Sequence, residues 1–337
     1  MLQRRSRIPG LKRQRLRWLT PRGGDRRAAA KGVVMAIDAV VLEKVTKRYN
    51  SVTAVDGLDL CVREGALFGL LGPNGAGKTT TLRMVMRMLV PDEGSIRVFD
   101  QPLSERAQDR IGYLPEERGL YPRMKVRQVL VFLGALKGLP EAEAGRRALA
   151  WLERMDLAGW ADRKIHDLSK GMQQKVQFIA AVLHRPPLLI LDEPFAGLDP
   201  LNAAQIKDIM LELRAQGATI ILSTHRMEQV EMMCDSICLI HQGRKVLDGD
   251  LQTVKRAYGM NTLRIQFTGD REFLNLPELV ESTNHFGVLV DVKLRPGADS
   301  QEILRAAVAR GVRITRFELI EPPLNDIFIE RVSRTDA

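Results

Sequence analysis

The chain has 337 residues, and its 51 Lys and Arg against 41 Asp and Glu give a formal net charge of +10. Its 45% hydrophobic and 27% charged residues are ordinary globular values, which excludes a largely disordered chain, and the length suggests about two domains. No apolar run exceeds eight residues, and only three cysteines are present, so a membrane-spanning helix and a disulfide framework are both excluded.

The first segment of the chain carries the whole charge excess. Residues 1–34 hold 11 Lys and Arg and one acid, Asp25, which leaves 40 basic and 40 acidic side chains in the rest. The segment has no periodic apolar pattern and no apolar core of a secretory signal, so we expect a disordered basic extension. Two interpretations stay open: translation starts at Met35, or the extension contacts anionic lipid or RNA.

After Met35, apolar strand-like runs alternate with helical stretches, a pattern typical of a parallel α/β sheet. A block of about residues 117–185 is mostly helical. The last part, 262–337, has its own alternation and predicts a small α+β domain. The predicted strands are 39–42, 58–62, 66–71, 188–191, 218–222, 263–267, 288–294 and 312–319, and the predicted helices include 78–89 and 301–309.

A glycine-rich motif follows the buried strand 66–71 and precedes a helix. It matches G-x-x-x-x-G-K-[ST], in which glycines let backbone N–H groups surround a polyphosphate and the helix N-terminus adds its positive dipole. Lys78 supplies a cation for the β- and γ-phosphates, and the Thr79 hydroxyl is suited to Mg²⁺. We therefore predict that a nucleoside triphosphate binds to Gly72, Pro73, Asn74, Gly75, Ala76, Gly77, Lys78, Thr79 and Thr80.

Two carboxylates end the apolar strand 188–191. A parallel strand delivers such side chains to the carboxyl edge of the sheet, where the phosphate loop also lies. Asp192 is predicted to hold Mg²⁺, and Glu193 to take a proton from the attacking water or to orient it. The structural alternative is that Asp192-Glu193-Pro194 is only a turn.

Over residues 36–255, the sequence resembles the nucleotide-binding subunit of ABC transporters. Four markers match the family's pattern, and Glu116 departs from it. Leu168-Ser-Lys-Gly-Met-Gln173 resembles the signature Leu-Ser-Gly-Gly-Gln, Gly197-Leu-Asp199-Pro200 the loop after the catalytic acid, and Ser223-Thr-His225 the switch histidine. Tyr49 occupies the place of the adenine-stacking aromatic, and Glu116 stands where the family usually has a Gln that meets the metal.

The resemblance implies a role for each of these residues. Ser169 and Gly171 would contact the γ-phosphate bound to a second subunit, His225 would sense that phosphate, and Glu116 would be a further Mg²⁺ ligand. Asp199 would join the nucleotide-binding residues, with Glu193, His225 and Lys78 as the catalytic group. The simpler readings are a core histidine at 225, packing at Tyr49 and a helix N-cap at Ser169.

The implied fold class is α/β: a P-loop NTPase core of the ABC type with a helical subdomain, plus a small C-terminal α+β domain. The implied domains are a basic extension at 1–34, an ATPase domain at 35–257 with its helical subdomain at about 117–185, and an accessory domain at 262–337. The C-terminal segment has an apolar helical face, which favours packing in the core of that accessory domain. The face consists of Leu324, Ile327, Phe328 and Val332.

The resemblance also implies partners and a location. Two ATPase subunits, identical or different, would sandwich ATP and drive separate transmembrane permease subunits. The loop 113–121 and the C-terminal Glu321–Glu330 segment resemble the exporter branch of sodium and drug efflux ATPases, at the inner face of the cell membrane.

The sequence offers two alternative functions. A soluble ATPase of the same superfamily would act on nucleic acid or ribosomes through the basic extension, but such proteins usually carry two cores or a coiled-coil insertion. A regulatory module without hydrolysis is disfavoured by Asp192-Glu193 and His225. Nucleic acid is therefore not the expected partner.

Overall fold

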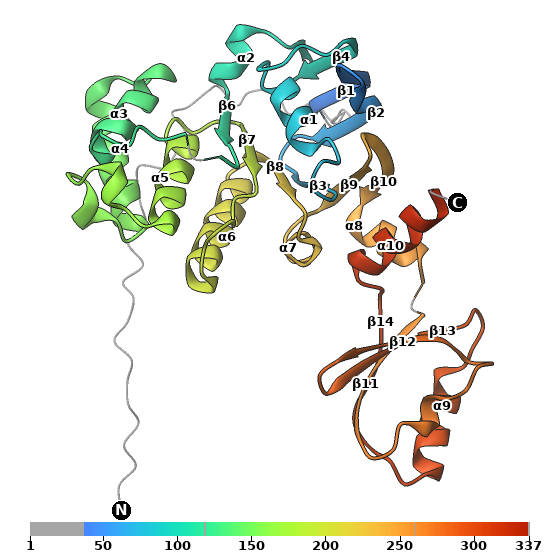
Figure 1. The fold of residues 1–337 in the computed structure, drawn as a ribbon. Coiled ribbons are helices and arrows are strands. Elements are labelled where there is room, and N and C mark those ends of the chain that lie inside the picture. The colour runs from blue at the N-terminus through green and yellow to red at the C-terminus, as the bar shows by residue number, and fades with distance from the viewer. Residues whose placement is uncertain (1–36, 118, 260, 336–337) are drawn as a thin grey trace, which may run out of the picture. The chain divides into compact units, whose positions relative to one another are not determined.

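The computed structural model describes residues 37–117, 119–259 and 261–335 (Figure 1). The predicted basic extension, residues 1–34, lies outside the described residues, so the expectations about it stay predictions. In the described part of the chain, no helix has the length and apolar character needed to cross a membrane.

A six-stranded sheet forms the centre of the molecule. Its order is β10-β9-β3-β8-β7-β6, with all neighbours parallel except the edge strand β10. The parallel arrangement confirms the α/β expectation and brings the carboxyl ends of β3, β7 and β8 to one edge. The strands are β3 Leu67–Leu71, β6 Ile111–Leu114, β7 Leu188–Asp192, β8 Thr219–Thr224, β9 Ser236–His241 and β10 Arg244–Asp250.

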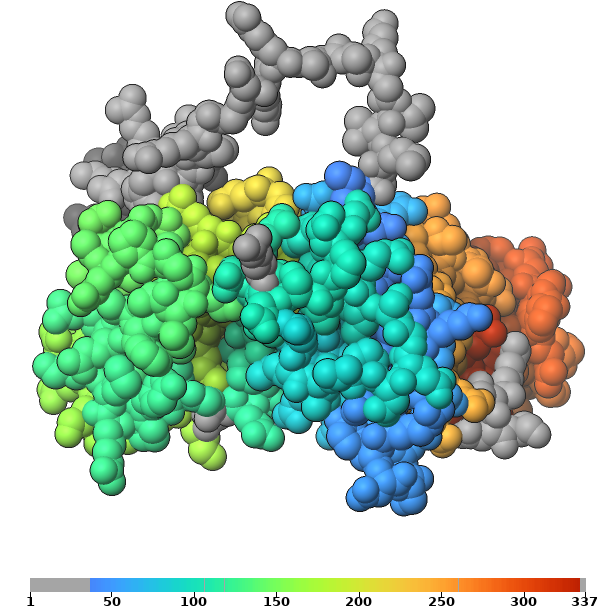
Figure 2. Space-filling view, turned by 90° about the horizontal axis from the view of Figure 1, so that it is seen from above, coloured from blue at the N-terminus to red at the C-terminus, as the bar shows by residue number. Residues whose placement is uncertain are grey.

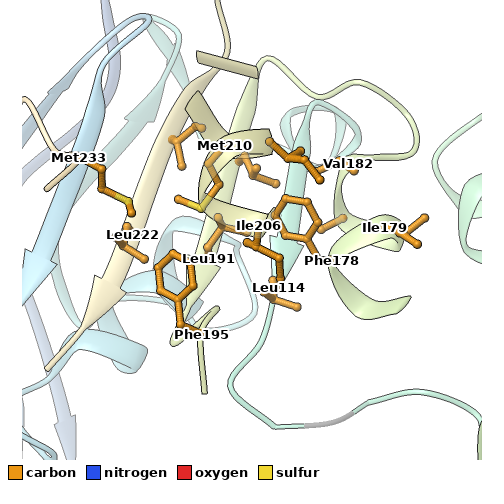
Figure 3. Close-up of a cluster of buried hydrophobic side chains, with 14 of the residues drawn as sticks. Leu114, Phe178, Ile179, Val182, Leu191, Phe195, Ile206, Met210, Leu222 and Met233 are labelled. Atoms are coloured by element: carbon orange, nitrogen blue, oxygen red, sulfur yellow. The ribbon is translucent and has the colours of Figure 1, made fainter. Parts of the chain in front are cut away.

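Both faces of this sheet are buried, which explains why its strands are continuously apolar. Leu189 and Leu191 face one core cluster, and Leu188 and Ile190 face the other, because side chains alternate along a strand. Figure 3 shows part of the first cluster, where side chains of β7 and β8 meet those of helices α5 (Lys170–Val182) and α6 (Pro200–Ala215).

The second cluster lies between the central sheet and an antiparallel sheet, which has the order β2-β1-β4-β5. Its strands are β1 Asp38–Tyr49, β2 Val52–Arg63, β4 Glu93–Val98 and β5 Gln101–Pro102. The first two strands are much longer than the runs 39–42 and 58–62 predicted for them, because pairing with each other continues well beyond the apolar residues.

The helical block contains α3 Val126–Leu136, α4 Glu141–Arg154 and α5, and its surface is green in Figure 2. Two single-turn 3₁₀ helices, Ala158–Trp160 and Ile165–Asp167, connect α4 to α5. The predicted helix 78–89 is shorter than expected: α1 spans Lys78–Val85, and Arg87 adopts a left-handed φ of 55° that ends it. Outside this block, the short helices before the C-terminal unit are α2 Glu105–Asp109, α7 Met227–Glu231 and α8 Leu251–Ala257.

A four-stranded antiparallel sheet of order β12-β13-β11-β14 forms the C-terminal unit. Helix α9 (Ser300–Ala309) packs on one face of it around Phe273 and Ile303, so this unit has a core of its own. The edge strand β12 was not predicted, since its side chains are mostly polar and exposed. The strands are β11 Thr262–Thr268, β12 Val280–Phe286, β13 Leu289–Leu294 and β14 Arg313–Ile320.

The last helix, α10 (Leu324–Thr335), corrects one expectation. Leu324 and Ile327 are buried in the first core cluster of the central sheet, and Phe328 packs against it, whereas the sequence favoured the core of the C-terminal unit. Helix α10 therefore returns to the ATPase core. Cys234 and Cys238 are both buried, and Cys238 lies on strand β9.

Candidate active site

The loop between β3 and α1 has the backbone that the motif requires. Gly72 and Gly77 have φ values of 152° and 103°. A Cβ on Gly72 would lie 2.2 Å from the carbonyl oxygen of Ile240, and one on Gly77 would lie 2.4 Å from that of Ala54. Only glycine fits these two places, because neighbouring backbone approaches them closely. The other loop residues, Pro73, Asn74, Gly75 and Ala76, lie between them, and Thr80 follows in α1.

Lys78 begins α1, and its side chain turns back over the loop. The ammonium donates hydrogen bonds to the carbonyl oxygens of Gly72, at 2.7 Å, and Pro73, at 3.0 Å. Burial lowers the pKa of Lys78, while the charges of Glu193, Asp192 and Glu116 act in the opposite direction. The cation is thus held at the phosphate loop, with carboxylates near enough to affect its charge.

Asp192 is joined directly to the loop. The Thr79 hydroxyl donates a hydrogen bond of 2.8 Å to Oδ2 of Asp192, at the end of β7. Oδ1 is buried and has no hydrogen-bond partner, and burial raises the pKa of this carboxyl. A hydroxyl, a carboxylate and an unsatisfied oxygen form the hard oxygen donor set that Mg²⁺ prefers, so these residues fit that ion.

Glu193 follows Asp192 and binds the end of the next strand. Its Oε1 accepts a hydrogen bond from the backbone N–H of His225 at 2.9 Å and lies 2.7 Å from Nδ1 of His225. Its Oε2 accepts a hydrogen bond of 3.0 Å from the Thr224 hydroxyl. The carboxylate is therefore fixed at the sheet edge, beside the loop that holds Lys78.

Two of the residues around Glu193 were not singled out from the sequence. The sequence indicated Thr224 only as the residue before His225. Its position at the end of a buried strand could have identified it as a site residue. Gln174 is buried on α5, and its Nε2 donates a hydrogen bond of 3.2 Å to the carbonyl of Pro194, directly after Glu193. No pattern in the sequence indicates that contact, because 20 residues separate the partners.

Glu116 lies in the loop after β6, and its side chain is exposed. Within the described residues, no hydrogen bond or ion pair holds its carboxylate, and it affects Lys78 only through its charge. The same loop is attached to α5, since Nε2 of Gln177 donates a hydrogen bond of 3.1 Å to the carbonyl of Glu117. The role of Glu116 as a metal ligand stays a prediction.

The signature residues lie at the N-terminus of α5. The expectation that Ser169 is an N-cap is confirmed, since its hydroxyl accepts a hydrogen bond from the backbone N–H of Met172. A Cβ on Gly171 would face Gly197 and Leu198 of the same chain, at 3.7 and 3.5 Å. In the part of the chain that the structure describes, no hydrogen bond joins this helix end to the phosphate loop.

No hydrogen bond or ion pair joins Asp199 or Tyr49 to Asp192 or Glu193 in the described residues. Asp199 is the N-cap of α6 and accepts a hydrogen bond of 2.9 Å from the backbone N–H of Asn202, which lowers the pKa of its carboxyl. Tyr49 ends β1 with 43% of its surface exposed, and the Lys47 ammonium is 5.9 Å from its ring centroid. An exposed ring is available to stack on a planar base.

Comparisons with known proteins agree with this geometry. The family model described as ABC transporter matches residues 55–196, and one described as ATP-binding protein DrrA1-3-like, C-terminal domain, matches residues 249–332. The uncharacterized ABC transporter ATP-binding protein YhaQ of Bacillus subtilis is 45% identical over 87% of this chain and 98% of its own length. The linearmycin resistance ATP-binding protein LnrL of the same organism is 33% identical over 87% of this chain and 98% of its own length.

Solved structures show the same fold. A dimeric ATP-binding cassette in a post-hydrolysis state, bound to ADP and phosphate, matches with a TM-score of 0.59 and 25% identity. The match covers 63% of this chain and 98% of that one.

Proposed function

This chain belongs to the ATP-binding proteins of ABC transporters, and we propose that it energises an exporter by ATP-driven dimerisation. ATP hydrolysis is the activity of the family. We propose in addition that two subunits dimerise, that the residues above carry out hydrolysis, that a permease is the partner, and that transport is outward. They would place the protein at the inner face of the cell membrane.

The observation that carries the proposal is the meeting of three strand ends. Thr79 after β3, Asp192 and Glu193 after β7, and His225 after β8 are linked by the hydrogen bonds Thr79–Asp192 and His225–Glu193. A cation, a hydroxyl and two carboxylates thus stand together at the carboxyl edge of a parallel sheet, which is where α/β proteins bind ligands.

These groups suit in-line hydrolysis of the γ-phosphate. Water forms the new bond to phosphorus while the bond to the leaving ADP oxygen breaks, and Glu193 accepts the proton of that water. Lys78 and the loop N–H groups stabilise charge on the phosphate oxygens. Thr79 and Asp192 are the residues that would hold Mg²⁺, which neutralises phosphate charge when bound.

A second subunit would supply the contacts to the γ-phosphate that the α5 N-terminus of this chain does not make at its own phosphate loop. Ser169 and Lys170 are exposed at the N-terminus of α5, a helix end that favours anions. Within the described chain, no hydrogen bond or ion pair joins them to the phosphate loop. We infer that this end meets the γ-phosphate bound to a partner. ATP then joins two subunits, and its hydrolysis separates them.

An exposed aromatic pair favours docking of a permease on the helical block. Tyr121 and Phe132 are 47% and 40% exposed, and their rings meet edge to face with centroids 5.6 Å apart. Tyr121 belongs to the segment 113–121, which begins in β6. Burial raises the pKa of the phenol of Tyr113, at its start, and Tyr113 is close enough to Asp192 for the charge of that carboxylate to raise it further. Aromatic residues are enriched at protein interfaces. Movement at the ATP site would therefore reach the membrane partner through this loop.

The test is co-purification with the multi-span protein encoded beside this chain, followed by ATPase assays with candidate cargoes. We expect a stable complex whose ATPase rate rises with cargo, and loss of the complex in Phe132→Asp. Phe286→Asp, at an aromatic of the C-terminal sheet that is 60% exposed, is the control. If the chain purifies alone with every such partner, the exporter proposal is wrong.

A further inference from the structure

A cavity of about 770 Å³ lies where the C-terminal sheet faces α8 and α10. One side is formed by β12 and β13, which present the polar face of the sheet, opposite the face covered by α9. The other side is formed by the end of α8, including Tyr258, and by the α10 residues Asp326, Ile327 and Glu330. The volume falls within the range of drug-sized ligand pockets.

The cavity is richer in carboxylates than in cations. Its lining includes the carboxylates of Glu281, Asp291, Asp326 and Glu330, and the cations Lys293 and Arg331. Arg264, which lies outside the lining, pairs with Asp291 at 2.6 Å. Lys293 is shared between Glu281 at 3.0 Å and Glu330 at 3.6 Å.

Asp326 is the carboxylate that this pairing leaves over. It lies in the first turn of α10 and is half-buried, and no ion pair joins it to a cation within the described residues. Burial raises the pKa of Asp326, the charges of Asp291 and Glu231 raise it further, and the charge of Lys293 lowers it. Because Lys293 makes its ion pairs with Glu281 and Glu330, the half-buried Asp326 carboxylate favours a further cationic partner.

From the cavity, its surplus of carboxylate and the unpaired Asp326, we infer a binding site for an amphipathic organic amine. The protonated amino group would bind to Asp326. Ile329, which is 54% exposed, and Pro296 offer apolar surface to the body of the ligand. Asn261, Ser282 and Asn284 offer hydrogen bonds. A bare metal ion fits less well, because no cluster of three ligating side chains occurs in the described chain.

The site is separate from the nucleotide site, so its test does not depend on ATP. We would titrate nucleotide-free protein with three probes that share one ring and differ in charge: tryptamine, tryptophol and indole-3-acetate, using calorimetry. Tryptamine is expected to bind roughly tenfold or more tightly than the neutral and anionic probes, because hydrogen bonds between charged groups are the stronger ones.

Asp326→Asn is expected to weaken tryptamine binding to about the level of tryptophol and to leave tryptophol unchanged. Asp208→Asn, which removes an exposed charge on α6, is the matched control and should bind as the parent does. Unfolding temperatures of both variants show whether they are folded. Equal affinity for the three probes, no saturable tryptamine binding, or full tryptamine affinity in folded Asp326→Asn would overturn the inference.

Discussion

The carboxylate of Glu193 and the imidazole of His225 are 2.7 Å apart, from Oε1 to Nδ1, although 32 residues separate them in the chain. Glu193 has a φ of 47°, a left-handed conformation that is uncommon for residues other than glycine. Backbone strain of this kind is kept where surrounding contacts hold it, often at functional sites. Here the contacts come from Thr224 and His225.

Removing the imidazole should therefore misplace the carboxylate. We expect His225→Ala to lower kcat roughly 10²-fold with little change in KM, since misplacing a reacting group costs about that much. His166→Ala, at an exposed histidine of the helical block, is the control and should behave as the parent does.

Asp192 should limit stability while it serves the metal. Its pKa is raised in the folded protein, chiefly by burial, so the folded chain takes up a proton more readily than the unfolded chain does. The ionised form therefore costs folding free energy at pH values above the raised pKa. Asp192→Asn should raise the unfolding temperature of the nucleotide-free protein at pH 7.5 by the order of one to a few degrees.

The same variant should lose Mg²⁺-dependent nucleotide hydrolysis, because Oδ1 no longer carries charge. Differential scanning calorimetry and a magnesium titration of ATPase activity measure the two effects. A lower unfolding temperature together with normal magnesium dependence would contradict the assignment of Asp192.

Helix α10 should be released when Glu231 loses its charge. Oε1 of Glu231 accepts hydrogen bonds from the backbone N–H of Leu324 at 2.9 Å and from Lys255 at 3.0 Å. It thus fixes the first turn of α10 to the end of α7, whose last residue is Glu231. In Glu231→Gln, we expect faster amide exchange in residues 324–333, measured by hydrogen exchange and mass spectrometry.

Glu228→Gln, an exposed charge on the same short helix α7, serves as its control. Exchange that is unchanged in Glu231→Gln, or equally fast in both variants, would show that α10 is held by its apolar face alone.

His184 should make the protein sensitive to acid. Burial, and secondly the charge of Lys137, lower its pKa to about 4, from a usual 6.5. The unfolded chain then binds the proton more readily, so stability falls as the pH falls from 6.5 towards 4. Between pH 7.5 and 5, we expect the free energy of unfolding of the parent to fall by about 2 kcal/mol because of this histidine. His184→Gln should not show this loss.

Urea unfolding at the two pH values measures this difference. The exposed His166→Gln should keep the parent's pH dependence, whereas equal pH dependence in the parent and His184→Gln would contradict the origin proposed for it.

The sequence predicted three of the six central strands, β3, β7 and β8, and the phosphate loop, because these are local patterns. A continuous apolar run that ends in Asp192-Glu193 identifies a buried parallel strand, and the Gly72–Thr80 motif depends on neighbouring residues. The N-cap at Ser169 was also predictable, since capping involves residues only three apart.

Long-range packing could not be predicted in the same way. The apolar face of α10 was visible, but periodicity shows only that a face is buried, and not which core buries it. The contact between Gln174 and Pro194 likewise depends on how α5 packs against β7. Strand β12 escaped because its stability comes from pairing with β13 and not from apolar side chains.

The most direct test of the account is ATP turnover and assembly of Glu193→Gln. This change keeps the size of the side chain and removes the proton acceptor, whose contribution is about 10²–10⁴-fold. We expect ATP to bind as in the parent, turnover to fall by at least about 10²-fold, and light scattering to show a dimer that accumulates with ATP and not with ADP. Turnover near that of the parent, with no ATP-dependent dimer, would contradict it.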